Sequence, residues 1–198
     1  MNSEAPATPR KSAAWSRILE TATRLFYAEG VHTVGIDRII AEAGVAKATF
    51  YHHFPSKDDL VRAYIVEQSR RQREIAERTP AAGPRETLLA AFDRLCRFGA
   101  EPTYRGCPFI NAAAEYPDPV HPVRQAIGDH RNWCRELFHD LLVADGHPDP
   151  GRTAEILVLL KDGLAVGLDL DDPESLRYAV VEAATRVLDA AGPGTADR

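Results

Sequence analysis

The chain has 198 residues, of which 44% are hydrophobic, and its formal net charge is −5. This length is enough to bury a core in one large domain or in two small ones. No run of about 18 apolar residues occurs, and the opening sequence MNSEAPATPRKSAAW lacks the apolar stretch of a secretory signal, so we expect neither a membrane partner nor export. The three cysteines are far apart and odd in number, which argues against a disulfide framework and fits the reducing cytoplasm.

The charge is unevenly distributed along the chain. Residues 10–80 hold twelve Lys and Arg against nine Asp and Glu, a net charge of +3. Residues 81–198 hold twelve against nineteen, a net charge of −7. Such an arrangement would turn the basic part toward a phosphate backbone.

Nearly all of the chain has the apolar spacing of helices. Residues 1–11 are rich in Pro and Ala and are expected to form a flexible arm. No later segment alternates with a period of two, so the sequence predicts an all-α fold of about nine helices without a β-sheet. The predicted helices span 14–29, 36–43, 47–54, 56–78, 85–98, the short segment between Pro108 and Pro117, 123–143, 152–168 and 174–191.

Local signals mark several helix ends. Gly30 and Gly44 are suited to follow a helix, and Ser56 with Asp59 three residues later is a plausible capping pair. The segment TPAAGP, residues 79–84, breaks the helical pattern and is the strongest candidate for a domain boundary.

The segment GVAKATFYHHFPSKDDL, residues 44–60, has the pattern of a helix-turn-helix that contacts DNA. Gly44 can adopt the left-handed conformation that lets one helix cross the next steeply. Phe50 and Phe54 are four residues apart and share one face, which is suited to a buried anchor. The opposite surface then presents Lys47, Ala48, Thr49, Tyr51, His52 and His53.

The residue types on this surface suggest two kinds of DNA contact. Lys47 and Thr49 lie in the first turn, where a lysine donates to guanine and a threonine methyl contacts thymine. Tyr51, His53 and Lys57 are better placed for phosphates, which fix register without reading sequence. For this pattern by itself, an amphipathic helical hairpin with solvated charges is the competing interpretation.

Residues 15–65, WSRILETATRLFYAEGVHTVGIDRIIAEAGVAKATFYHHFPSKDDLVRAYI, closely resemble the N-terminal domain of the tetracycline-repressor (TetR) family. The matching elements are ILETATRLFYAEG, IIAEAGVAKATFYHHF and SKDDL, in the family's order and spacing. The resemblance implies a homodimeric transcriptional repressor that binds a palindromic operator in double-stranded DNA. It also implies a C-terminal domain that binds a small-molecule effector and then releases the DNA, with no cofactor.

By matching position, the resemblance implies that Lys47, Ala48 and Thr49 read bases and that Tyr51, His53 and Lys57 hold phosphates. His52 stands where an aromatic ring often sits. The expected domains are an arm (1–11), a helix-turn-helix domain (12–58), an effector-binding and dimerisation domain (59–192) and a tail (193–198).

Four positions depart from the family's pattern. Gly35 and Ala46 stand where the family usually has hydroxyl residues that cap the two helices. Ile40 replaces a small residue where the two helices approach, and Asp37 stands where many relatives carry a basic residue. Contacts of the first of these helices with DNA are therefore in doubt.

An effector site is predicted around the irregular middle of the chain. The stretch RGCPFINAAAEYPDPVHPVR resembles one in a subset of the family, in which this short helix borders the effector cavity. An apolar pocket with few polar groups would suit a hydrophobic or aromatic effector, although the same aromatic residues are also suited to a core. The candidate residues are Phe92, Cys96, Tyr104, Phe109, Asn111, Glu115, His130 and Trp133.

The segment EILVLLKDGLAVGLDL has more apolar surface than one helix face can hide. Gly163 and Gly167 are four apart and permit close helix approach, and in the family the last two helices pair with those of a second copy. A fully buried core helix of a monomer is the alternative. The predicted dimer interface comprises Leu157, Leu160, Gly163, Leu164, Gly167, Tyr178, Val181 and Thr185.

Other functions have weaker signals. Cys107 lies before Pro108, where a helix dipole can lower a thiol pKa, so a redox-responsive regulator is one alternative. His130 and Cys134 share a helix face and define a metal-responsive alternative, without a CxxC motif to support it. No P-loop, GxGxxG, GxSxG or HExxH motif occurs, so we expect no enzyme, and a helical enzyme or ligand carrier is the remote alternative.

Overall fold

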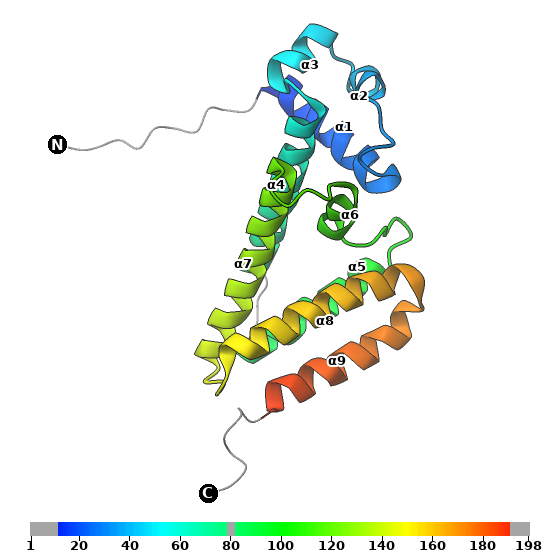
Figure 1. Cartoon of the computed structure of the whole chain (residues 1–198). Coiled ribbons are helices and arrows are strands. Elements are labelled where there is room, and N and C mark those ends of the chain that lie inside the picture. Colours follow the sequence, from blue (N-terminus) through cyan, green and yellow to red (C-terminus); the bar gives the residue numbers. More distant parts are fainter. Residues whose placement is uncertain (1–11, 79–81, 191–198) are drawn as a thin grey trace, which may run out of the picture. The chain divides into compact units, whose positions relative to one another are not determined.

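The computed structural model describes residues 12–78 and 82–190, which contain nine α-helices and no strand (Figure 1). The all-α prediction is confirmed, and the predicted helix ends differ by at most two residues from the observed ones. The helices are α1 (Ala13–Glu29), α2 (Ile36–Ala43), α3 (Lys47–His53), α4 (Lys57–Glu77), α5 (Pro84–Gly99), α6 (Pro108–Glu115), α7 (Pro122–Ala144), α8 (Pro150–Leu170) and α9 (Pro173–Asp189).

These residues form two compact units, one up to Tyr64 and one from Ile65 onward. The division lies inside α4, whereas the sequence suggested residues 58/59 or the break at 79–84. Leu60, Val61 and Tyr64 are buried, and the Tyr64 ring lies edge-on to Phe26 with centroids 5.7 Å apart, so the first turns of α4 complete the N-terminal core. The predicted arm 1–11 and tail 193–198 lie outside the described residues, as do residues 79–81.

Aromatic packing holds the N-terminal unit together. Phe50 and Phe54 are buried at 0% and 3% exposure, as their four-residue spacing predicted. The Phe54 ring stacks on Trp15 of α1 with centroids 5.8 Å apart. Around them the core contains Ile18, Leu25, Phe26, Val34 and Ile39.

Side-chain caps fix two helix starts in this unit. The Ser12 hydroxyl accepts a hydrogen bond from the Trp15 amide at the start of α1 (3.0 Å). The Ser56 hydroxyl accepts from the Asp59 amide (3.1 Å) and donates to the Asp59 carboxylate (2.7 Å), which confirms the predicted capping pair. Gly35 and Ala46, which precede α2 and α3, make no such bond.

The turn between α2 and α3 depends on Gly44. Its φ of 61° and ψ of 44° place it in the left-handed region, and its amide bonds to the carbonyls of Ala41 and Ile40. Three residues separate the end of α2 from Lys47, so this one glycine redirects the chain into α3.

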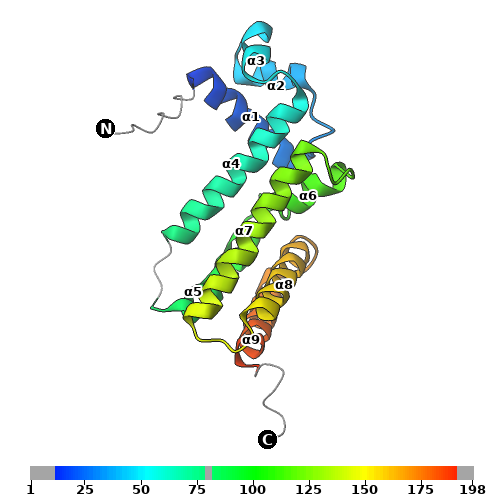
Figure 2. The same ribbon diagram turned by 60° about the vertical axis from the view of Figure 1, so that its left-hand side comes forward.

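In the C-terminal unit, α5, α7, α8 and α9 surround one core, with α8 lying along both α5 and α9 (Figures 1 and 2). A Cβ atom on Gly99 of α5 would lie 2.6 Å from the Leu168 side chain, so the glycine permits this close approach of α5 and α8. The buried core residues of these helices include Leu88, Phe92, Phe138, Leu142, Leu157, Val158, Leu164, Leu168, Val180, Ala184 and Leu188.

None of the helices in the described ranges combines the length and the apolar character needed to cross a bilayer.

Replacing Gly44 by Ala should destabilise the N-terminal unit by about 1–2 kcal/mol, because an L-residue is strained at positive φ. No heavy atom lies within 4 Å of the added Cβ, so a clash would not contribute. The measurement is urea unfolding followed by Trp15 fluorescence in a Trp133→Phe background, since these are the two tryptophans of the chain.

Gly35→Ser is the matched control, because Gly35 has an ordinary φ of −78° and precedes α2 without a cap bond. It should raise stability by a few tenths of a kcal/mol. A Gly44→Ala variant as stable as the parent would contradict the strain argument.

Candidate nucleic-acid interface

The outer surface of α3 is open to solvent. Because Phe50 and Phe54 face inward, Lys47, Ala48, Tyr51 and His52 point outward and are exposed, with Tyr51 at 41%. The other three predicted contact residues are half-buried at the edges of this surface: Thr49, His53 and Lys57. The structure therefore gathers all seven predicted residues on and beside α3.

Two of the edge residues already have partners. The His53 Nε2 atom lies 3.0 Å from the Ser12 hydroxyl, so the imidazole is tied to the start of α1. The Lys57 Nζ atom donates to the His32 carbonyl at 3.3 Å. These contacts restrict the side chain of His53 at the end of α3 and that of Lys57 at the start of α4.

Lys47 pairs with an acidic residue of the preceding helix. Its Nζ atom lies 3.3 Å from the Asp37 carboxylate, and the two side chains are 66% and 87% exposed. An ion pair this exposed contributes little to stability and exchanges easily for another anion. Asp37 therefore pairs with the ammonium group that the sequence predicts to contact a base edge.

The sequence did not predict the ion-pair network that joins α1 to α2. Arg38 donates to Glu29 and to Glu42, in both cases at 2.8 Å, and Arg24 also pairs with Glu42. Hydrogen bonds from Arg38 hold the pKa of Glu29 below its usual value, and those from Arg24 and Arg38 do so for Glu42. The i,i+4 spacing of Arg38 and Glu42 was the available signal. Arg38 therefore links α2 to α1 through its contacts with these carboxylates.

A short exposed helix, aimed by a left-handed glycine and anchored by buried phenylalanines, defines a helix-turn-helix DNA-binding protein. Comparison with known proteins makes the class more specific. Residues 18–64 match the family model described as bacterial regulatory proteins, tetR family. The chain is 42% identical to SCO4454, a TetR-family transcriptional regulator from Streptomyces coelicolor, over 88% of this chain and 94% of that one, with a TM-score of 0.81.

Two further relatives agree. The putative TetR transcriptional regulator sav143 from Streptomyces avermitilis is 27% identical over 88% of this chain and 99% of that chain, with a TM-score of 0.76. The HTH-type transcriptional regulator LmrA from Bacillus subtilis is 30% identical over 60% of this chain, and the match spans 65% of its own length. The chain belongs to the TetR family and is a DNA-binding transcriptional regulator, not an enzyme.

The eight predicted effector residues all lie in the C-terminal unit, some in the core around α5 and α8 and the others on α6 and α7. Phe92, Cys96 and Tyr104 belong to the core around α5 and α8, and the Tyr104 hydroxyl donates to the Ala165 carbonyl at 2.8 Å. The Phe109 ring stacks on His130 with centroids 3.5 Å apart. The remaining residues are Trp133, which is half-buried beside His130, the exposed Asn111 and the half-buried Glu115.

His130 is held as a neutral ring inside the unit. It is 3% exposed, its Nδ1 atom lies 3.1 Å from the Ser69 hydroxyl, and its Nε2 atom lies 3.5 Å from the Cys134 sulfur. Burial first, and then the cations Lys161 and Arg73, lower the pKa of His130 to about 3. The predicted aromatic group around His130 is thus closely packed in this structure.

A pocket does occur in the C-terminal unit, but none of the eight residues lines it. It lies between α4 and α5 and has a volume of about 790 Å³. Four of its described lining residues are arginines. Aromatic rings are the main basis of the predicted effector set, which therefore does not include these arginines.

The predicted dimer residues divide between the core and the surface. Leu157 and Leu164 are buried at 0% and 5%, and a Cβ on Gly167 would lie 3.1 Å from Leu176 of the same chain. We therefore assign these three to packing within the chain. Leu160, Val181 and Thr185 are half-buried, whereas Gly163 and Tyr178 are exposed.

Of the outward apolar stripe of α8, the predicted dimer residues include only Gly163, because this helix is apolar on several faces. The stripe consists of exposed residues that recur every three or four positions, as one face of a helix requires. They are Ile156, Leu159, Gly163, Val166 and Leu170.

The redox and metal alternatives gain little from the geometry. Burial raises the pKa of the Cys134 thiol, which lowers its reactivity at neutral pH. Cys107 precedes α6 and is half-buried. His130 and Cys134 do approach each other, but the described residues contain no group of three or more His, Cys, Asp or Glu side chains able to hold a metal ion.

Replacing Asp37 by Asn should strengthen binding to duplex DNA by roughly threefold at low salt, because the variant releases Lys47 from its ion pair. Fluorescence anisotropy with a labelled duplex of arbitrary sequence measures this change. Glu20→Gln removes one exposed carboxylate from α1 and should leave the affinity unchanged. Equal gains from both variants would show that only net charge matters.

Proposed function

We propose that the protein is a ligand-responsive repressor that binds a palindromic operator as a homodimer. The observation that carries the proposal is the exposed face of α3, in which Lys47, Ala48, Tyr51 and His52 stand together on a helix fixed by Gly44 and Phe50. Such a helix fits the major groove, where donors and acceptors distinguish all four base pairs. Because chromosomal DNA is the partner, we infer that the protein acts in the cytoplasm.

Within this surface we assign two roles. Lys47, Ala48 and Thr49, in the first turn of α3, would contact base edges. Tyr51, His53 and Lys57 would hold phosphates on either side, supported for the last two by the contacts that fix their positions. His52 is exposed beside them and would contact the groove edge.

The two roles predict different defects. Lys47→Ala should change the preferred base at one operator position by about 1–3 kcal/mol, whereas Lys57→Gln should weaken binding to all sequences and reduce the salt dependence, because it removes a cation from a phosphate contact. Selection from a random duplex library gives base preference, and titration at several salt concentrations gives the slope. If Lys47→Ala kept both affinity and preference, the base-reading role would be wrong.

Dimerisation is supported by the outward apolar stripe of α8. Leu159 is 64% exposed and Leu170 is 73% exposed, and Tyr178 of α9 is exposed to 74%. No heavy atom lies within 4 Å of a Cβ added to Gly163, so the stripe has an open centre where a second helix can approach closely. A two-fold interface would bury this surface and set two α3 helices at one operator.

Replacing Leu159 by Glu should raise the dimer dissociation constant by on the order of a hundredfold, because it buries an unpaired charge in the interface. Light scattering at micromolar concentration measures the mass. Val120→Glu is the matched control, since Val120 is 71% exposed and lies outside α8 and α9. A parent protein that is monomeric under these conditions would overturn the dimer.

Ligand response is the remaining part of the proposal. An effector shifts a conformational equilibrium only by its different affinity for the two states. We infer that its binding site lies in the C-terminal unit. The pocket between α4 and α5 supports this part, because α4 supplies residues to both units.

A further inference from the structure

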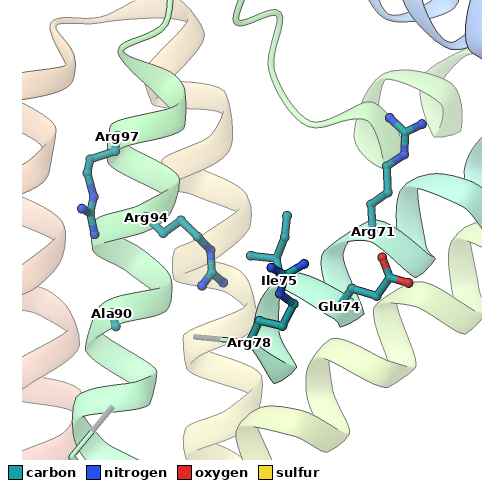
Figure 3. A pocket seen from close by; sticks show the side chains of 7 residues that line it. All are labelled: Arg71, Glu74, Ile75, Arg78, Ala90, Arg94 and Arg97. Atoms are coloured by element: carbon teal, nitrogen blue, oxygen red, sulfur yellow. The ribbon is translucent and has the colours of Figure 1, made fainter. Parts of the chain in front are cut away.

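The pocket in the C-terminal unit is formed by two facing helix surfaces. The α4 residues recur at helical spacing, as do those of α5, so each set forms one side of the pocket. Figure 3 shows Arg94 extending from α5 toward α4, where Ile75 and Arg78 lie. The lining residues are Arg71, Glu74, Ile75 and Arg78 of α4 and Ala90, Arg94 and Arg97 of α5.

The lining is strongly positive in charge. Of its described residues four are arginines and one is a carboxylate, Glu74, which is itself paired with Arg70 outside the lining. The two arginines at the sides have carboxylate partners outside the lining: Arg71 lies 3.1 Å from Glu67, and Arg97 lies 2.7 Å from Asp93.

Arg94 occupies an unfavourable place for a cation. It is half-buried, and its burial, followed by the nearby Arg97 guanidinium, lowers its pKa. An anion brought to this guanidinium would accept charge-assisted hydrogen bonds from it and would offset the repulsion between Arg94 and Arg97.

The pocket also has apolar surface. Ile75 is 48% exposed, Ala90 lies opposite on α5, and the methylene stems of the arginines add to the walls. A volume of about 790 Å³ is in the range of small-molecule sites. A small inorganic anion would leave this apolar wall uncovered.

We propose that this pocket binds an organic anion with an apolar body, whose acidic group is held by Arg94 and Arg78. A carboxylate matches the planar donors of a guanidinium, which favours a carboxylic acid over a neutral or cationic molecule of the same shape. As the effector site this proposal rests on the ligand response proposed above, but as a binding site it stands independently.

The test is isothermal titration of the full-length, DNA-free protein with octanoate, 1-octanol and inorganic phosphate. Octanoate should bind at least about tenfold more tightly than either of the others, because only octanoate has both the charge and the apolar chain. Binding of octanol or phosphate as tight as that of octanoate would overturn the proposal.

Variants locate the site. Arg94→Gln and Arg78→Gln should each weaken octanoate binding by about tenfold. Arg152→Gln removes one exposed positive charge from α8, outside the pocket, and should have no effect. Circular dichroism and urea midpoints confirm that each variant is folded. Unchanged octanoate binding in both pocket variants would overturn the assignment, as would a loss of DNA binding in its place, which would show that these arginines face a nucleic acid.

A separate measurement distinguishes the two proposals. Adding octanoate to the protein bound to its selected operator tests the ligand response. If octanoate binds at Arg94 and the operator stays occupied, the anion site stands and the ligand response fails. If octanoate does not bind, the anion site fails, whatever another ligand does to the operator.

Discussion

The burial of Phe50 and Phe54 is the constraint on which the DNA-binding surface depends. Both rings lie in the N-terminal core, and Phe54 stacks on Trp15. Once this face of α3 is fixed inward, the seven-residue helix has only one other face to offer, and Lys47, Ala48, Tyr51 and His52 are on it. The orientation of the proposed DNA-contacting face therefore depends on two apolar side chains that are buried in the core.

Three polar contacts within the chain also restrict side chains on and beside α3. Ser12, His32 and Asp37 bind His53, Lys57 and Lys47 in turn. Each contact restricts the rotamers of its side chain before any ligand binds, which lowers the entropy that the side chain would lose on binding DNA. If these side chains contact DNA as proposed, each of these contacts would also have to be exchanged or shared.

Local patterns predicted the helices and the core of the N-terminal unit, because helical periodicity and the Ser56 cap are encoded within a few residues. They failed at α8, where apolar residues occupy several faces and only packing on α5 and α9 decides that Leu157 is inside and Leu159 outside. They failed again at the pocket, since Arg78 and Arg94 are separated by the break between α4 and α5. Which faces of two helices meet is a tertiary property that neither segment carries alone.

The division of the chain inside α4 has a thermodynamic consequence. Lys57 and the pocket residues Arg71 and Arg78 belong to one continuous helix, although Tyr64 and Ile65 fall in different units. If an anion bound between α4 and α5 lowers the affinity of the protein for an operator by some factor, the operator must lower its affinity for the anion by the same factor. The protein on DNA would then be a poorer receptor than the protein in solution, and its threshold for the signal would depend on how many operators are occupied.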